Sequence, residues 1–570
     1  MFSSIEKFFN SLTTSRAIKI IIIVGIIVFF NSLFNGFVWD DISQIVENPG
    51  VHSLSNIPSF FFGTQDIFGN IIKIHAVYYR PLMASLFIII YSFFGSNAFF
   101  FHLLSIVIHI TITILVFIFF RRFFKQFIAF FLALIFLIHP LNTEVVNYIS
   151  AYNDLLYLLF GLIALILVQT NINWFKKILL ISIAVFLSLL SKESGFLFIP
   201  IILVYVFLYR ENKERYSISL ALGLVIFAYW LLRTSFYVDK PLNQVLGFSP
   251  FLHMFIAGHL INIPKIFYYY IGNFFFPIHQ AIAQHWVVQN ITFADFYFPL
   301  IVLAGFIIFN SYLFFYSCQS KDVLKNFIFF SIWFWFGMFF YFQLFPLDMT
   351  VADRWFYFPI IGLLGLIGIF SNRLTHKKII KNIIISLISV YIVLIATKTI
   401  IRNTDWFNEY TLYTHDLKIE SQSFDLENQL GIVYSKQGKP EEAKLHFEKS
   451  IRLWQCSQAQ NNLGYLNQQE GNIAIAEKHY IKAVSCDGEY KSYGNLILLL
   501  FKENKLDLAD RYAKEGIKNY PNSAALYYLL GLTEYKRGDR ENALKNLNIS
   551  YQLSHDPQIM NTLIQMQNKQ

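Results

Sequence analysis

Apolar runs of about 20 residues recur along the first 400 positions of the chain, separated by short polar gaps; IKIIIIVGIIVFFNSLF is the earliest. An α-helix rises about 1.5 Å per residue, so about 20 apolar residues cross the ~30 Å hydrocarbon core of a bilayer. The pattern therefore predicts transmembrane helices. We place eleven of them, near residues 17–35, 98–120, 127–143, 150–169, 177–191, 195–209, 217–235, 297–316, 326–345, 354–370 and 381–400.

Basic residues gather in alternate gaps between these runs, for example in NWFKK and YRENKER. Because cytoplasmic loops carry the excess of Lys and Arg, these gaps mark the cytoplasmic side. The predicted topology has a cytoplasmic amino terminus and an extracytoplasmic carboxyl terminus. Two further apolar segments, 81–95 and 251–277, do not fit simple spans, and we expect interfacial or re-entrant helices on the outer face. A pair of short spans is the alternative for the second segment.

The hydrophobic pattern changes after about residue 423, where the chain becomes repetitive. Ala443, Ala476, Ala509 and Ala543 are 33, 33 and 34 residues apart. Glycines seven residues apart recur in three repeats, and the third repeat has Asn504 in place of the second glycine. This is the tetratricopeptide (TPR) pattern of paired helices, whose solenoids bind partners. We predict an all-α protein with a membrane domain over 1–400 (first outer loop 36–97), a linker over 401–423, and about four TPRs over 424–570.

The composition supports a membrane protein. Of 570 residues, 56% are hydrophobic and 14% charged, and the mean hydropathy is +0.49. The net charge of +9 lies largely in the short gaps between spans, so it indicates membrane topology and not a nucleic-acid partner. The three cysteines have neither a disulfide framework nor metal-ligand spacing. The abundance of Ile, Phe, Lys and Asn favours a bacterial inner membrane; in a eukaryote the endoplasmic reticulum is expected.

Ionisable residues stand at the predicted outer ends of the spans, where such groups suggest function. A pair of carboxylates, Asp40 and Asp41, can act as a general base on a hydroxyl or hold a divalent ion. Cationic side chains in the other outer gaps can bind phosphate through charge-assisted hydrogen bonds: Arg80, His139, Lys192 and Arg354. Together they suggest a reaction in which a hydroxyl attacks and a lipid-borne phosphate leaves.

Each of these residues also has a structural alternative. The aspartates can cap the helix that DDISQIV begins, and His139 can end a helix before Pro140. Lys192 can pair with Glu193 in a tight turn, and Asp353 with Arg354. The hypothesis of a site depends on several such features lying on one face.

Several motifs, in this order and followed by TPRs, resemble the TMTC family of multi-span O-mannosyltransferases and its bacterial relatives: FVWDDISQIVENPGV, YYRPL, HPLNTEVVNYISAYNDLL, SKESG, ADRWFYFPIIG and RNTDWFNEYTLY. The resemblance implies a GT-C glycosyltransferase fold, a polyprenyl- or dolichyl-phosphate sugar donor, and transfer with inversion. It makes Asp40 the leading catalytic acid and Asp41 its companion. Recurrent motif positions are matched by Arg80, His139, Glu144, Lys192, Glu193 and Arg354. Asp353 stands where the family often has Glu, in DRW instead of Glu-Arg-Tyr.

The expected function is transfer of a sugar, most simply mannose, from the lipid-phosphate donor to Ser/Thr hydroxyls of a protein that the TPRs recruit. No cofactor is certain from the sequence, and Mg²⁺ or Mn²⁺ remains open because some GT-C enzymes use a divalent ion. The alternatives are a cell-envelope lipid or oligosaccharide glycosyltransferase of the same fold and a non-catalytic membrane-anchored TPR scaffold. A transporter is weaker, since its ionisable residues belong near the bilayer midplane.

Overall fold

The computed structural model describes residues 12–62, 79–235, 251, 254–374, 378–454, 457–486, 490–554 and 556–568. Residues 63–78 of the expected outer loop, including Tyr78 of YYRPL, and residues 252–253 lie outside this part of the chain. The described elements are helices, with one isolated antiparallel bridge between Gln284 and Val351. Two compact units divide the chain: the first holds most of the sequence up to Ile419, and the second contains Glu420–Gln570.

The first unit is a bundle of long apolar helices joined by short turns. Its principal helices are α2 (Thr14–Phe29), α4 (Pro81–Phe94), α5 (Ala98–Phe120), α6 (Gln126–Ile138), α7 (Thr143–Asn147), α8 (Tyr152–Gln169), α9 (Trp174–Ser191), α10 (Phe198–Tyr209), α11 (Asn212–Ser235), α13 (Ile256–Phe275), α14 (Phe298–Ser317), α15 (Lys321–Phe339), α16 (Pro359–Leu374), α17 (Lys378–Asp405) and α18 (Glu409–Ile419).

The lengths of these helices can be compared with the eleven predicted spans. Eight of the described helices are long and apolar enough to cross a membrane, or nine if α6 and the following segment Pro140–Asn147, bent by 53°, form one span. The sixth and tenth predicted spans coincide with the shorter apolar helices Glu193–Tyr209 and Pro359–Asn372. These two helices are shorter than the ~20 residues that a span usually has, and hydropathy does not reveal where such a helix ends.

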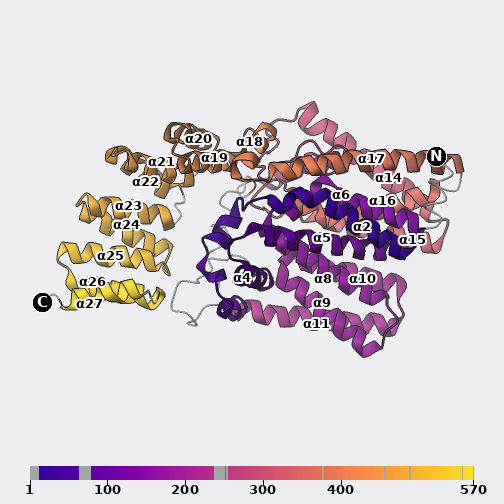
Figure 1. Ribbon diagram of the computed structural model, residues 1–570, viewed down its shortest axis with the longest axis horizontal. Coiled ribbons are helices and arrows are strands. Elements are labelled where there is room, and N and C mark those ends of the chain that lie inside the picture. The colour runs from indigo at the N-terminus through magenta and orange to yellow at the C-terminus, as the bar shows by residue number, and fades with distance from the viewer. Residues whose placement is uncertain are drawn as a thin grey trace. The chain divides into compact units, whose positions relative to one another are not determined.

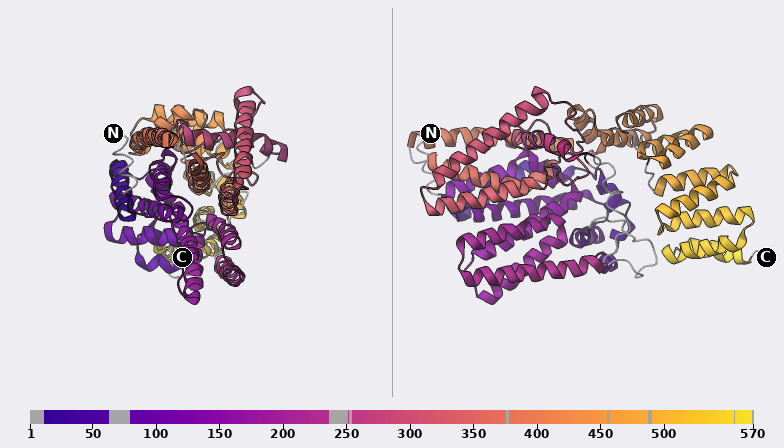
Figure 2. Two further views of the ribbon diagram at one scale, coloured as in Figure 1. Left: turned by 90° about the vertical axis from the view of Figure 1, so that its right-hand side faces the viewer. Right: turned by 180° about the vertical axis from the view of Figure 1, so that it is seen from behind.

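The long helices lie side by side (Figures 1 and 2): α5 contacts α8, α8 contacts α9, and α9 contacts α11. Glycine permits the closest of these approaches. A Cβ at Gly161 of α8 would lie 2.1 Å from the ring of Phe198 in α10, so a larger residue would push the two helices apart. Late in the chain, α17 packs on α2, α6 and α7 and thereby joins the end of the unit to its beginning.

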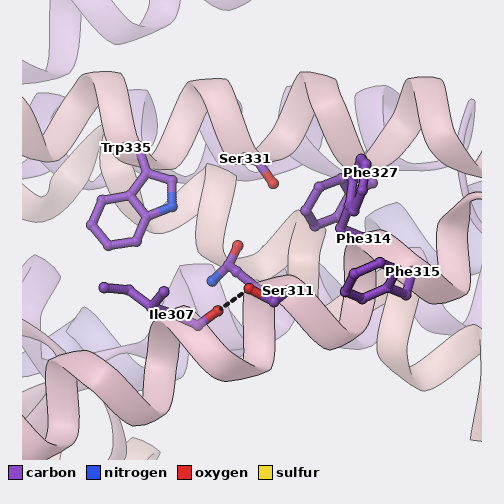
Figure 3. A pocket seen from close by; sticks show the side chains of 8 residues that line it. Ile307, Ser311, Phe314, Phe315, Phe327, Ser331 and Trp335 are labelled. Carbon is purple, nitrogen blue, oxygen red and sulfur yellow. Dashed lines mark hydrogen bonds between the residues drawn. The ribbon is translucent and has the colours of Figure 1, made fainter.

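A groove of about 380 Å³ lies between α14 and α15 (Figure 3). Ile307, Phe314 and Trp335 are among the apolar residues that line it. Inside it, Asn310 Oδ1 and Ser331 Oγ have no hydrogen-bond partner among the described residues. None of the residues predicted to be catalytic or phosphate-binding lines this groove, so it is separate from the site considered below.

The second unit confirms the TPR prediction. It contains four helix pairs and a final helix: α19 (Phe424–Lys436) with α20 (Pro440–Leu453), α21 (Ser457–Gln469) with α22 (Ile473–Ser485), α23 (Tyr490–Lys502) with α24 (Leu506–Asn519), α25 (Ala524–Arg537) with α26 (Arg540–Ser554), and α27 (Pro557–Asn568). The four repeat alanines are fully buried. Asn504 has a φ of 57°, in the region that the turn glycines of the other three repeats occupy.

The segment expected to be a linker is largely helical. Residues 401–405 belong to α17, and α18 follows. Both helices belong to the first compact unit, and Arg402, Trp406 and Tyr413 are buried there. The sequence RNTDWFNEYTLY thus packs with the membrane domain.

Candidate active site

The acidic segment leaves the membrane through a strained turn. α2 ends in a short 3-10 helix, η1 (Phe30–Phe34), and the chain then turns at Trp39, whose φ is 54°. A non-glycine residue in this region costs about 1–2 kcal/mol, so neighbouring contacts must hold it. The Trp39 N–H donates to Tyr413 Oη at 3.2 Å, and the two rings lie 5.7 Å apart. After the turn, Asp40 is exposed and Asp41 is fully buried.

Asp41 holds the loop together. Its Oδ1 accepts hydrogen bonds from the backbone N–H and the hydroxyl of Ser150, both at 2.7 Å, and its Oδ2 accepts from the Val38 N–H at 3.2 Å. Burial raises the pKa of Asp41 to about 7, against the lowering effect of these hydrogen bonds. The Asp41 side chain does not cap the following short helix, η2 (Ile42–Val46), so the capping alternative does not hold for Asp41.

Asp40 contacts the cationic part of the site through one tyrosine. The Tyr148 hydroxyl donates a hydrogen bond to Asp40 Oδ2 at 2.6 Å. The guanidinium carbon of Arg354 lies 5.9 Å from the centre of the same tyrosine ring. An exposed carboxylate and a guanidinium, 314 positions apart in sequence, therefore flank one aromatic side chain.

Arg354 forms a buried ion pair with Glu144. The pair joins η9 (Asp353–Tyr357), a 3-10 helix, to α7. The guanidinium binds Glu144 Oε1, and the backbone N–H of Arg354 donates to Oε2 at 3.0 Å. Glu144 is 2% exposed and the Arg354 side chain 13%. Both carboxylate oxygens are thus occupied, and Arg354 does not pair with Asp353.

Lys192 and Arg80 form two further ion pairs nearby. Lys192 Nζ lies 2.6 and 2.7 Å from the two oxygens of Asp154. Arg80 Nη2 lies 3.2 Å from Glu193 Oε2. Burial lowers the pKa of Lys192, and the charges of Arg80 and Arg354 lower this pKa further. The Asp154 carboxylate acts in the opposite direction and raises the pKa. The three cations are therefore within electrostatic reach of one another, and Lys192 does not pair with its neighbour Glu193.

His139 and Asp353 have different surroundings. His139 Nδ1 accepts from the Leu141 N–H at 3.2 Å, its Nε2 lies 2.9 Å from the Phe274 carbonyl oxygen, and its ring stacks on Phe274. His139 therefore ends a helix, as its structural alternative proposed. Asp353 accepts from Tyr269 Oη at 2.6 Å and from Gln280 Nε2 at 3.1 Å. Burial, followed by the charge of Glu144, raises the pKa of Asp353.

Sequence reasoning did not single out Tyr148, Asp154 or the asparagines that brace the acidic segment. Asn35 donates to Asn147 Oδ1 at 2.9 Å, and Asn147 donates to Asn403 Oδ1 at 2.8 Å. All three asparagines are buried. Buried amides at the ends of predicted spans are a signal that would have identified this network. In the described ranges, no three His, Cys, Asp or Glu side chains come together as metal ligands.

The fold defines a polytopic helical membrane protein that carries a TPR solenoid. A tetratricopeptide-repeat family model matches residues 428–455. Over 90% of its length the chain is 23% identical to the protein O-mannosyl-transferase TMTC3 of Mus musculus and to that of Homo sapiens, and over 77% it is 25% identical to the protein O-mannosyl-transferase F38B6.6 of Caenorhabditis elegans. The chain is therefore a homologue of the TMTC proteins, as its motifs predicted. It spans 61%, 62% and 63% of the length of these relatives.

Two solved structures are also similar to part of the chain. YrrB, described as a TPR protein with an unusual peptide-binding site, is 22% identical and covers 27% of this chain and 81% of its own, with a TM-score of 0.24. MamA is 22% identical and covers 25% and 84%, with a TM-score of 0.23.

Proposed function

We propose that this protein is an inverting GT-C-type glycosyltransferase that transfers a sugar, mannose in the simplest case, from a polyprenyl-phosphate donor to a Ser or Thr hydroxyl of a protein. The observation that carries the proposal is the contact of exposed Asp40 with Tyr148, whose ring faces the Arg354 guanidinium. A base for the attacking hydroxyl and a cation for the leaving phosphate are thus held in one place. The similarity to named O-mannosyl-transferases supports the choice of sugar and acceptor.

In the proposed reaction, Asp40 accepts the proton of the acceptor hydroxyl, and Tyr148 orients the carboxylate. The hydroxyl oxygen forms a bond to the anomeric carbon from the face opposite the phosphate. The bond from that carbon to the phosphate oxygen breaks, and its electron pair leaves with the polyprenyl phosphate. Lys192, Arg80 and Arg354 stabilise the developing phosphate charge electrostatically. Asp41 fixes the loop and takes no proton from the acceptor.

Buried carboxylates support this division of roles. Glu144 and Asp154 each use both oxygens to hold one cation, so they position Arg354 and Lys192 beside the site. Glu193 plays the same part for Arg80. We place the site and the TPRs on the extracytoplasmic side, where the solenoid recruits the acceptor polypeptide.

The test is transfer by purified protein. The full chain in lipid nanodiscs is given radiolabelled polyprenyl-phosphate mannose together with a pool of unfolded polypeptides and a pool of membrane lipids. We expect label in Ser- or Thr-linked form on polypeptide, with none when Asp40→Asn replaces the wild type. Label on lipid alone would identify a cell-envelope glycosyltransferase. No label with any sugar donor would refute the transferase and favour the non-catalytic TPR scaffold.

A further inference from the structure

A second guanidinium shares the carboxylate of Glu193. Arg233 lies in the last turn of α11, and its Nη1 is 3.5 Å from Glu193 Oε1 and 3.2 Å from Tyr229 Oη. Arg80 binds the other oxygen, Oε2, through both Nε and Nη2 at 3.2 Å. One carboxylate therefore serves two guanidinium groups, which come from the start of α4 and the end of α11.

The exposure of Arg233 separates it from the other cations of the site. Its side chain is 40% exposed, compared with 19% for Arg80, 13% for Arg354 and 11% for Lys192. Its contact with a carboxylate is also the longest of the four. Breaking a buried ion pair leaves a carboxylate without its counter-charge, so an incoming anion gains little by displacing Glu144 from Arg354 or Asp154 from Lys192. Arg233 can receive an anion without such a separation.

The position of Arg233 also fits a lipid-borne ligand. The residue is near the end of a candidate span, Asn212–Thr234, where long cationic side chains extend to the headgroup region. A lipid-linked phosphate lies at the same depth. The planar guanidinium offers paired N–H donors to phosphate oxygens, and the Tyr229 hydroxyl limits its rotation.

We propose that Arg233, together with Arg80, forms the entry site for the phosphate of the lipid-linked donor, with Glu193 holding the two guanidinium groups at the right separation. The inference rests on the proposed transferase function. It assigns first contact with the phosphate to exposed Arg233 beside Arg80, and stabilisation of the departing phosphate to Arg80 and the more deeply buried Lys192 and Arg354.

The first experiment measures binding of a short-chain polyprenyl phosphate without sugar to the full chain in nanodiscs. Loss of one charge-assisted contact, worth about 1.5–3 kcal/mol, corresponds to at least about a tenfold weaker Kd for Arg233→Gln. Arg233→Lys keeps the charge but loses the paired N–H donors of the planar guanidinium, so we expect an intermediate Kd. The matched control is Arg215→Gln. Arg215 lies in the same helix and bonds the Arg210 carbonyl oxygen at 2.7 Å, so its substitution should leave the Kd unchanged.

Competition identifies the source of the phosphate. We expect unlabelled polyprenyl phosphate to displace the bound ligand at lower concentrations than inorganic phosphate or phosphatidylglycerol vesicles do. This preference for polyprenyl phosphate should be larger in the wild type than in Arg233→Gln. Equal binding of polyprenyl phosphate by the wild type and Arg233→Gln would overturn the inference. So would an equal loss toward phosphatidylglycerol, because Arg233 would then be a general headgroup contact.

Transfer kinetics separate this inference from the function on which it rests. In Arg233→Gln we expect the KM for the sugar donor to rise about tenfold, with kcat changed far less, because the lost contact belongs to donor entry. Transfer with an unchanged KM would refute the role of Arg233 and leave the transferase intact. Arg233-dependent binding by a wild type that transfers no sugar would retain the phosphate site and refute the transferase.

Discussion

Replacing each aspartate of the Asp40–Asp41 pair by asparagine separates catalysis from folding. Asp41 accepts from two backbone N–H groups through different oxygens, from Ser150 at 2.7 Å and from Val38 at 3.2 Å. Asparagine has one acceptor oxygen, so its NH₂ group faces one of these donors in either rotamer. A buried N–H left without a partner costs about 1–3 kcal/mol, and Asp41→Asn should lower the unfolding free energy by that amount.

Asp40→Asn should abolish transfer and leave the unfolding free energy nearly unchanged. Asp40 is exposed, and asparagine keeps an oxygen that can accept from Tyr148, so the unfolding free energy should change by no more than about 0.5 kcal/mol. The amide cannot take the proton of the acceptor hydroxyl. Loss of a general base typically lowers the rate by about 10²–10⁴, which is about 3–5 kcal/mol in the barrier.

Both variants are assayed in the same nanodisc preparation, for sugar transfer under saturating donor and for the apparent Tm by tryptophan fluorescence. We expect wild-type Tm without transfer for Asp40→Asn, and a lowered Tm for Asp41→Asn. Wild-type transfer by Asp40→Asn would remove Asp40 from the mechanism. An unchanged Tm for Asp41→Asn would show that its three hydrogen bonds do not hold the loop.

Three other predictions address pH, the repeats and the topology. Burial raises the pKa of Asp41 from 3.8 to about 7, so the stability that Asp41 contributes is complete below pH ~4 and is lost as the pH rises through about 7. The Tm of the wild type should therefore exceed that of Asp41→Asn by more at pH 5 than at pH 8. An equal Tm difference at the two pH values would contradict the raised pKa. A Cβ at Gly431 would lie 2.6 Å from the Phe447 ring, so Gly431→Ala should destabilise the solenoid by about 1–3 kcal/mol, measured by limited proteolysis of the full chain. A Cβ at Gly494 would meet nothing within 4 Å, so Gly494→Ala should not destabilise it. Equal effects of the two substitutions would contradict the packing argument. A tag after Gln570 should be cleaved by protease added outside the cytoplasm, and a protected tag would refute the topology drawn from the basic gaps.

The long helices could be predicted because a run of about 20 consecutive apolar residues is rare outside transmembrane helices. The predicted spans 98–120 and 150–169 agree with Ala98–Phe120 and Ile149–Gln169 within a residue. The short helices α10 and α16 could not be separated from spans, because hydropathy reports apolar character and not the point where a helix ends. In the repeats, the turn at Asn504 was predictable because asparagine tolerates positive φ better than other non-glycine residues.

The candidate site was predictable only in part. Ionisable residues at the ends of apolar runs stand out in a sequence, and this pattern predicts Asp40, Lys192 and Arg354 as site residues. Their partners were not, because Glu144 and Arg354 are 210 positions apart and sequence carries no direct record of such contacts. Tyr148 and Arg233 were missed because tyrosine and arginine are ordinary residues at the membrane interface, where rings and long cationic side chains gather.

The ion pairs divide the charges of the site into two groups with different physical roles. Glu144 with Arg354, and Asp154 with Lys192, are nearly closed to solvent, so each pair is held in one geometry. Such pairs add little net stability, but they keep Arg354 fixed beside Tyr148, and Lys192 fixed within electrostatic reach of Arg354, without reorganisation during the reaction. Asp40 and Arg233 are the more exposed charges and can exchange their contacts with solvent for contacts with ligands. A site of this kind gains selectivity for a ligand that brings both a proton to remove and a phosphate to bind, because only that ligand engages both exposed groups.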